Sequence, residues 1–384
     1  MNTSGKQPWE VVYPPGVRTV HAGDRRRDWL LPVLVPASWL YQAASNAVRS
    51  VRSAGARRAP DDLCVVSVGN LEVGGSGKTP LSMHLVAGIA AAGGRPVYLS
   101  RGFGGIAERI DVVTVVPGTS DETPITRHAG VRGLRRGMAG LSAEVGDEGA
   151  MVARRLPEVP LLFCRDKWRA LDLAAKTLNP THAVMDDAFQ SWGVPRDIDI
   201  VLVDGGRPIG AGWLLPAGRL REPVEALERA DIVGVTLVED EAGLAAAHES
   251  IARAAGVRIP AFGIRRRIDV DWNGEEGWEN GRDSYAALSA IGQPELFEAH
   301  LARERQGLTL SFRYPDHHRY RASDLDWIVR EAEKRGIDTV VTTEKDWSKL
   351  SDLGAPRELF AVARLKLELF GEDPMAHILK KAAD

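Results

Sequence analysis

The sequence predicts an α/β protein, with a mostly parallel sheet covered by helices on both faces and a second, smaller α/β domain. Short β-branched runs alternate with helical patterns from residue 59 onward, which favours parallel strands joined by helices. The chain has 384 residues, 44% of them apolar and 26% charged, which is typical of a soluble globular protein with more than one core. The alternation loosens near residue 255, so we place the first α/β domain at 59–255 and the second at 256–384.

The expected elements follow the chain in order. In the first domain, the expected strands are 64–68, 96–100, 112–116, 161–164, 182–185, 198–203 and 232–238, and the expected helices are 80–92 and 148–155. Alternation in AFGIRRRIDVDW, residues 261–272, predicts a short antiparallel pair. In the second domain, YAALSAIG is expected to begin a helix that includes Leu296 and Phe297. The strand LTLSFRY, the amphipathic helix 323–335 and the strand 339–343 are expected after it.

The first sixty residues are basic, with nine Lys and Arg against three acids, whereas the whole chain has a net charge of −3. We expect residues 1–28 to be a poorly ordered basic extension. Residues 29–50 carry no charge before Arg49, but two prolines interrupt them. A helix is expected from Ser38, with an apolar stripe of Leu40, Ala44, Val48 and Val51. Tryptophans and flanking arginines favour docking of 29–58 at an anionic membrane surface, with a spanning helix and a core-packing helix as alternatives.

The two cysteines, Cys64 and Cys164, lie in apolar runs and lack metal-ligand spacing, so we expect buried thiols in a reducing compartment. The basic residues are interleaved with a proline-broken apolar run, and the remainder of the chain is acidic. This distribution argues against a nucleic-acid partner.

A phosphate-binding loop is the strongest motif in the chain. SVGNLEVGGSGKTP, residues 67–80, lies between an expected strand and an expected helix, although Glu72 occupies the place of the first glycine in the strict pattern. The glycines allow backbone amides to approach phosphate oxygens, Lys78 can reach the β- and γ-phosphates, and Thr79 can bind Mg²⁺. The expected nucleotide contacts are Gly74, Gly75, Ser76, Gly77, Lys78 and Thr79.

Acids at strand ends supply candidate metal ligands. Asp186 and Asp187 follow the apolar run HAVM and can hold Mg²⁺ together with Thr79. Asp204 ends another strand and is a rival ligand, and a turn with a helix cap is the alternative role for the paired acids.

Several further stretches resemble the tetraacyldisaccharide 4′-kinase family, which transfers the γ-phosphate of ATP to the disaccharide precursor of lipid A. They cover residues 29–350 in the family's order. Besides the loop, they are YLSRGFGG (98–105), VGDEG (145–149), DDAFQ (186–190), RDIDIVLVD (196–204), LLPAGRLREP (214–223), YPDHHRY (314–320) and VTTEKDWSKL (341–350). The family's loop also lacks the usual first glycine. This chain departs from the family's common residues at Phe103, Gly149 and Arg219, none of which replaces a charged catalytic group.

The resemblance implies a role for each matching residue. Asp147 is the expected catalytic carboxylate, which accepts the proton of the sugar hydroxyl; a helix cap is the alternative role. His317 is the expected partner of Asp147, with His318 as its rival and a surface turn as the alternative. Arg221 is expected near the γ-phosphate and Glu222 near the metal, unless they form a surface pair. Gln190 is expected to support the metal-site acids.

The resemblance also implies partners and a location. It implies ATP as co-substrate, Mg²⁺, the lipid A disaccharide precursor, and the cytoplasmic face of the bacterial inner membrane; no obligate protein partner is evident. Two other functions compete: a membrane-associated P-loop ATPase of the partitioning or metallocluster-carrier class, and a nucleotide-gated membrane adaptor. The ATPase class usually has a lysine where this chain has Val73, and it needs neither PDHH nor PAGRLREP.

Overall fold

The computed structural model describes residues 9–14, 31–55, 57–60, 62–105, 107, 112–115, 124–128, 135–136, 141–207, 209, 212–272 and 284–382. The chain forms two compact units. The larger unit comprises Arg25–Arg267 and Leu367–Asp384, and the smaller comprises Met1–Asp24 and Ile268–Lys366. This division differs from the predicted boundary near residue 255. The boundaries between the units fall after Asp24, within β11 (Ala261–Asp271) and within β15 (Phe360–Gly371).

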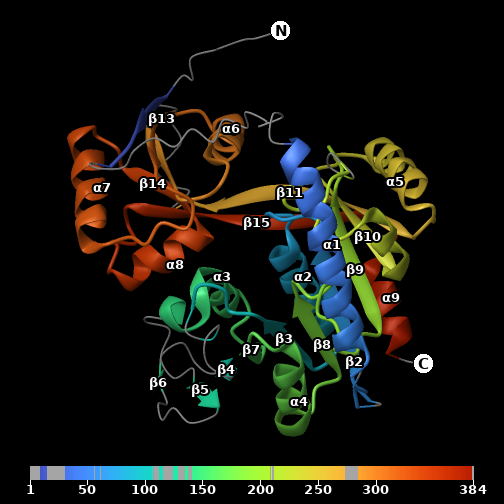
Figure 1. Ribbon diagram of the computed structural model, residues 1–384. Coiled ribbons are helices and arrows are strands. Elements are labelled where there is room, and N and C mark those ends of the chain that lie inside the picture. Colours follow the sequence, from blue (N-terminus) through green and yellow to red (C-terminus); the bar gives the residue numbers. More distant parts are fainter. Residues whose placement is uncertain are drawn as a thin grey trace. The chain divides into compact units, whose positions relative to one another are not determined.

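The larger unit is built on a mostly parallel sheet (Figure 1). Its strand order is β11-β10-β9-β2-β8-β3-β7-β4-β5-β6. The strands are β2 (Cys64–Asn70), β3 (Pro96–Ser100), β4 (Val112–Val115), β5 (Pro124–His128), β6 (Arg135–Arg136), β7 (Leu161–Phe163), β8 (His182–Asp186), β9 (Ile198–Asp204) and β10 (Ile232–Thr236). The pairs from β11 to β7 are parallel, and β4, β5 and β6 form an antiparallel edge. The mostly parallel sheet that the sequence predicts is confirmed.

Helices cover both faces of this sheet because successive strand residues point to opposite sides. Val66 of β2 packs in the core that contains α2 (Lys78–Ala91), α3 (Leu141–Arg155) and α9 (Pro374–Lys381). Its neighbour Val65 packs with α4 (Lys167–Leu178). Val201 of β9 packs with α5 (Glu241–Ala255) and the 3-10 helix η3 (Val224–Arg229). Cys64 and Cys164 are both buried thiols, as predicted.

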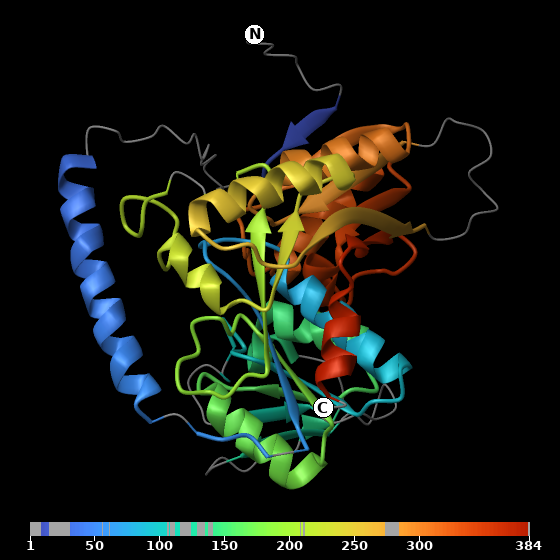
Figure 2. The ribbon, with the colours of Figure 1, turned by 90° about the vertical axis from the view of Figure 1, so that its right-hand side faces the viewer.

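Helix α1 (Leu31–Ser53) starts seven residues before the predicted helix and includes Pro36. It stands at the margin of its unit, beside the loop that follows β9 (Figure 2). The Ser38 hydroxyl donates to the Leu214 carbonyl at 3.0 Å, and the Tyr41 hydroxyl donates to the Arg221 carbonyl at 3.1 Å. The predicted apolar stripe faces outward: Leu40 is 74% exposed and Val51 is 76% exposed. A core-packing role for this stripe is therefore wrong.

The smaller unit has its own parallel sheet, in the order β1-β13-β12-β14-β15. Its strands are β1 (Glu10–Val12), β12 (Tyr285–Ser289), β13 (Leu308–Arg313), β14 (Thr339–Thr343) and the first part of β15. Its helices are α6 (Pro294–Glu304), α7 (Ala322–Lys334) and α8 (Glu344–Asp352). Ala286 packs in a core with α7 and α8, and Ala287 packs on the other face with α6.

Three predicted elements are corrected. Residues 285–289 form the strand β12 rather than a helix, because β12 lies between two strands and all its residues are buried. Residues 261–271 form one long strand, which pairs in parallel with β10 and neighbours β15, rather than two short antiparallel strands. In the extension 1–28, which was expected to be poorly ordered, residues 10–12 form β1 and pair with β13; residues 1–8 and 15–28 lie outside the described residues.

Candidate active site

The phosphate loop connects β2 to α2 at the carboxyl end of a central strand. Every residue of β2 is buried, so the loop starts from a rigid position. Gly77 caps α2 with a φ of 89°, and Gly74 has a φ of 128°, values that residues with a side chain rarely adopt. The amides that begin α2 have no partner within the helix and carry its positive dipole end, which suits an anion. The loop therefore has the geometry that its sequence predicts.

Lys78 is the first residue of α2, and its ammonium group is directed back into the loop. Its Nζ lies 3.4 Å from the Gly74 carbonyl oxygen, 3.5 Å from the Ser76 hydroxyl and 3.6 Å from the Asp187 carboxylate. The Lys78 side chain is 12% exposed. Its charge is thus held between the loop and the acid that follows β8.

Asp186 is the last residue of β8, and its carboxylate accepts hydrogen bonds from three hydroxyl groups. Thr79 donates to it at 2.7 Å, Tyr98 at 2.8 Å and Ser82 at 3.2 Å. Burial, followed by the negative charge of Asp186, raises the pKa of Tyr98 well above its ordinary value, so Tyr98 keeps its proton and donates. The structure brings Thr79 and Asp186 together as the sequence predicts. The rival Asp204 instead accepts the backbone amide of Gly206 at 2.9 Å.

Asp187 follows directly, with a φ of 48° that turns its carboxylate toward a group of cations. It lies 3.0 Å from Arg221, and Lys167 donates to its backbone carbonyl at 3.0 Å. Burial alone raises the pKa of the Asp187 carboxyl, but the charges of Lys78, Arg221 and Lys167 outweigh it and hold the pKa below its usual range. Asp187 therefore remains ionised among three positive groups.

Gln190, Arg221 and Glu222 are connected by hydrogen bonds. Gln190 donates to the Glu222 carboxylate at 2.9 Å and to the Asn70 carbonyl at 3.0 Å. Arg221 donates to the Gln190 side-chain oxygen at 3.3 Å. Glu222 is 4% exposed and also lies 3.0 Å from Arg229. The three residues are adjacent, and the burial of Glu222 makes the alternative of a surface pair for Arg221 and Glu222 wrong. Their roles near the γ-phosphate and the metal stay predictions.

The predicted metal ligands are Thr79, Asp186, Asp187 and Glu222. The first three lie at the loop, whereas Glu222 is linked to them through Gln190 and Arg221. Within the described part of the chain, no group of three or more His, Cys, Asp or Glu side chains is arranged to hold a metal ion. The full ligand set therefore stays a prediction.

Asp147 lies in α3, directly after a kink. Gly146 has a φ of 79° and a ψ of 169°, which interrupts the helix, so Asp147 begins its second part. A Cβ atom on Gly146 would lie 2.0 Å from the Phe103 carbonyl oxygen, so only glycine fits there. The charge of the adjacent Glu148 contributes to raising the pKa of Tyr98, which places this motif within electrostatic reach of the Asp186 site. The catalytic role of Asp147 stays a prediction.

The two histidines of PDHH belong to the smaller unit and differ in their surroundings. His317 has a φ of 59° and is 47% exposed; its Nε2 lies 3.4 Å from the Lys345 ammonium. His318 lies 3.2 Å from Asp324, and its ring packs against the rings of Tyr314 and Tyr320. His318 therefore has a packing role, and His317 is the one that presents its ring. The partnership of His317 with Asp147 stays a prediction.

Sequence reasoning missed Lys167 and Tyr98. Lys167 is buried, and burial lowers its pKa while the charges of Asp187 and Asp186 oppose that effect. Its only signal in the sequence was its position as the first residue of a helix, after a buried strand and the cap Asp166. Tyr98 lies inside YLSRGFGG, where its position in a strand gave no hint that its hydroxyl binds Asp186.

A cavity of about 1040 Å³ opens beside these residues within the larger unit. One part of it is lined by Lys167, Asp187, Gln190 and Arg221, and another by Arg52, near the end of α1, and Arg57, which follows the helix. Seven Lys and Arg line this cavity against two Asp, so it favours an anionic substrate.

The loop at the start of α2, its lysine, and the Thr79–Asp186 pair define the class of nucleotide-binding phosphotransferases with a phosphate loop. The family model described as tetraacyldisaccharide-1-P 4′-kinase matches residues 30–384, and the chain belongs to this family.

Individual relatives agree with this assignment. The chain is 36% identical over 363 residues to a tetraacyldisaccharide 4′-kinase of Anaeromyxobacter sp. (strain Fw109-5), covering 92% of each chain. It is 31% identical over 385 residues to the corresponding kinase of Pelobacter propionicus, covering 94% of this chain and 96% of the relative. The crystal structure of LpxK from Aquifex aeolicus in complex with ATP is similar in fold, with a TM-score of 0.65 at 24% identity over 93% of this chain and 99% of that chain.

Proposed function

We propose that the protein transfers the γ-phosphate of ATP to the 4′-hydroxyl of a tetraacyldisaccharide 1-phosphate, a precursor of lipid A. The observation that carries this proposal is that Lys78 and Thr79, at the start of α2, meet Asp187 and Asp186 at the carboxyl end of β8, in a chain of this kinase family. The loop amides and Lys78 bind the nucleotide phosphates, and Arg221 and Lys167 approach from the side of Asp187.

Mg²⁺ fits the oxygen-rich end of β8. The Thr79 hydroxyl and the Asp186 carboxylate already meet there at 2.7 Å, and hydroxyl and carboxylate oxygens are the ligands that Mg²⁺ prefers. Thr79, Asp186 and Asp187 would hold the ion, with Glu222 as a further carboxylate. When bound, the ion neutralises negative charge on the phosphates.

Asp147 is proposed to accept the proton of the 4′-hydroxyl and to aim its oxygen at the γ-phosphorus. The kink at Gly146 sets its position, because the helix restarts at this residue. Phosphoryl transfer depends mostly on positioning and on charge stabilisation, so a carboxylate in the correct place is sufficient. His317 is proposed to orient Asp147 and to adjust its charge. The exposed ring and the left-handed backbone of His317 support this choice over His318.

The lipid acceptor is proposed to approach along α1, at the cytoplasmic face of the bacterial inner membrane. No helix in the described ranges is long and apolar enough to cross a membrane. The outward stripe of Leu40, Ala44, Val48 and Val51 suits docking at the membrane–water boundary.

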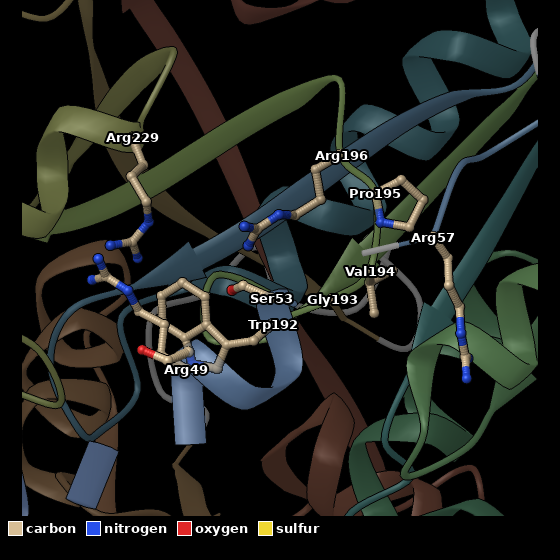
Figure 3. Close-up of a pocket in the computed structure, with 10 residues that line it drawn as sticks. Arg49, Ser53, Arg57, Trp192, Gly193, Val194, Pro195, Arg196 and Arg229 are labelled. Carbon is tan, nitrogen blue, oxygen red and sulfur yellow. The ribbon is translucent and has the colours of Figure 1, made fainter. Parts of the chain in front are cut away.

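A second cavity, of about 530 Å³, lies at the carboxyl end of α1 and supports an anionic surface as partner. Figure 3 shows Arg49 and Arg229 pointing toward one another beside Trp192. Burial lowers the pKa of Arg229; the paired Glu222 opposes this effect, whereas the charges of Arg196 and Arg49 add to it. A further negative group in this cavity would reduce the repulsion among the three arginines. Phosphate groups at a lipid surface meet this requirement.

The release of ADP tests this proposal. With ATP, Mg²⁺ and the disaccharide lipid in detergent micelles, we expect ADP release that depends on the lipid. Asp147→Asn should lower kcat by about a hundredfold or more with little change in ATP affinity, because the lost interaction belongs to the transition state.

Glu158→Gln, which changes an exposed acid in the turn after α3, is the matched control. Lipid-independent ADP release would favour the ATPase class, and full activity of Asp147→Asn would exclude Asp147 as the base.

A further inference from the structure

Three consecutive arginines, Arg265–Arg267, lie in β11 beyond its pairing with β10, which ends at Ile264. Side chains alternate along a strand, so the first and third share one face. Arg265 and Arg267 both bind the carboxylate of Glu368, at 3.1 and 3.3 Å. Arg266 therefore points to the opposite face.

That opposite face is the one covered by α2. Phe262 and Ile264, which lie four and two residues before Arg266, pack in the same core as Leu81 of α2. Arg266 is the next residue on this face of β11 after Ile264, and its guanidinium group lies at the start of α2. A Cβ atom built on Gly77 would lie only 3.0 Å from its Nη2 atom. Arg266 thus lies against the phosphate loop, within the same unit of the chain.

The charge of Arg266 is poorly compensated by the protein. Its Nε atom is buried and has no hydrogen-bond partner, and among the residues that the structure describes Arg266 forms no ion pair. Burial lowers the pKa of Arg266, and the negative charge of Asp204 offsets this only in part. The positive end of α2 and the ammonium of Lys78 lie at the same loop, and they add repulsion.

Arg219 provides a contrast, because it lies against the other end of the same loop. Its Nη2 lies 2.5 Å from where a Cβ of Gly74 would be. It donates to the Val73 carbonyl at 2.8 Å and lies 3.7 Å from the Glu72 carboxylate. The loop itself therefore supplies a hydrogen-bond acceptor and a negative charge for Arg219, whereas the Nε donor of Arg266 has no acceptor.

We propose that Arg266 binds a phosphate oxygen of the α,β-diphosphate portion of the nucleotide. This inference rests on the nucleotide binding of the proposed function and extends it beyond the loop. The diphosphate portion is the part that loop amides at the start of the helix hold, whereas Lys78 reaches toward the γ-phosphate. A bound phosphate supplies the acceptor that Arg266 lacks and the negative charge that the start of α2 favours. Arg266 is therefore a binding residue for ADP as well as for ATP.

The test compares Arg266→Met with wild type by calorimetric titration with ATP, ADP and AMP. We expect the affinities for ATP and ADP to fall by a similar factor, about ten- to a hundredfold, because each loses one hydrogen bond to a charged group. AMP, which lacks the β-phosphate, should be affected less. Arg266→Lys should recover part of the affinity, since it keeps the charge but not the planar donor pair.

The thermal stability of the nucleotide-free protein separates binding from a structural role. Replacing an unpaired, partly buried charge by an apolar side chain should leave the melting temperature unchanged or raise it. The control is Arg267→Met, which removes the neighbouring arginine on the opposite face and should leave nucleotide affinity unchanged. Equal ADP affinity in Arg266→Met and wild type would overturn the inference. A lower melting temperature of nucleotide-free Arg266→Met would also overturn it, because Arg266 would then have a partner in the protein.

These titrations use nucleotide alone, so they do not depend on the lipid acceptor. If wild type failed to phosphorylate the lipid while Arg266→Met lost ADP affinity, the proposed function would fail and this inference would stand. If the lipid were phosphorylated and Arg266→Met bound ADP normally, the proposed function would stand and this inference would fail.

Discussion

At the scale of residues, the two adjacent acids at the end of β8 have different partners. Asp186 is buried and accepts three hydroxyl groups, among them that of Thr79. Asp187 turns away through its left-handed backbone and meets Lys78 and Arg221. The sequence shows the pair, but it does not show this division, because the division depends on the turn at Asp187.

The Asp187 carboxylate makes a pH-dependent contribution to the free energy of unfolding. Its folded-state pKa lies below its usual range because of nearby Lys and Arg charges, so its contribution is present above about pH 3.9 and is lost as the pH falls through the folded-state value. Asp187→Asn should therefore be less stable than wild type at pH 7, and the difference should shrink toward pH 3. Asparagine tolerates the left-handed backbone, which keeps the comparison free of strain. Denaturant unfolding across this range measures the difference, and a constant difference would contradict the account.

At the scale of elements, sequence patterns located most strands but gave no information on how several of them pair. Polar or turn-forming flanks mark β3 and β14, and both were predicted at their observed bounds. β12 was mistaken for a helix because YAALS has small residues without strict alternation, and only burial on both faces identifies it as a strand. The kink in α3 was also missed, since the need for glycine at Gly146 comes from the carbonyl of Phe103, which is distant in sequence.

Helix α1 provides a prediction at the same scale. Leu40→Glu combined with Val48→Glu should weaken binding to vesicles of phosphatidylethanolamine and phosphatidylglycerol by about tenfold or more, because two apolar side chains no longer enter the interface. Both side chains are exposed, at 74% and 48%, so the melting temperature in solution should not change. Asn46→Glu, which adds a charge at an exposed polar position of α1, is the control. Co-sedimentation measures binding, and equal binding by all three proteins would show that the stripe does not contact lipid.

At the scale of the whole molecule, the order of motifs predicted the site better than it predicted the division of the chain. The loop, DDAFQ and LLPAGRLREP are far apart in sequence, yet Lys78, Asp187 and Arg221 meet within one unit. The return of residues 367–384 to the larger unit was not predicted, because it depends on Met375 and Ile378 packing in the core of α2. Arg266 was missed for a similar reason, since nothing in RRR distinguishes the arginine that faces the loop.

The central claim is that the phosphate goes to the lipid rather than to water. The most direct measurement is to incubate the protein with γ-labelled ATP, Mg²⁺ and the disaccharide 1-phosphate in micelles, and to locate the label. The account predicts label in the lipid, on the 4′-oxygen of the disaccharide, with transfer by Asp147→Asn slower by about a hundredfold or more. Label found only as free phosphate, at the same rate with and without lipid, would contradict it.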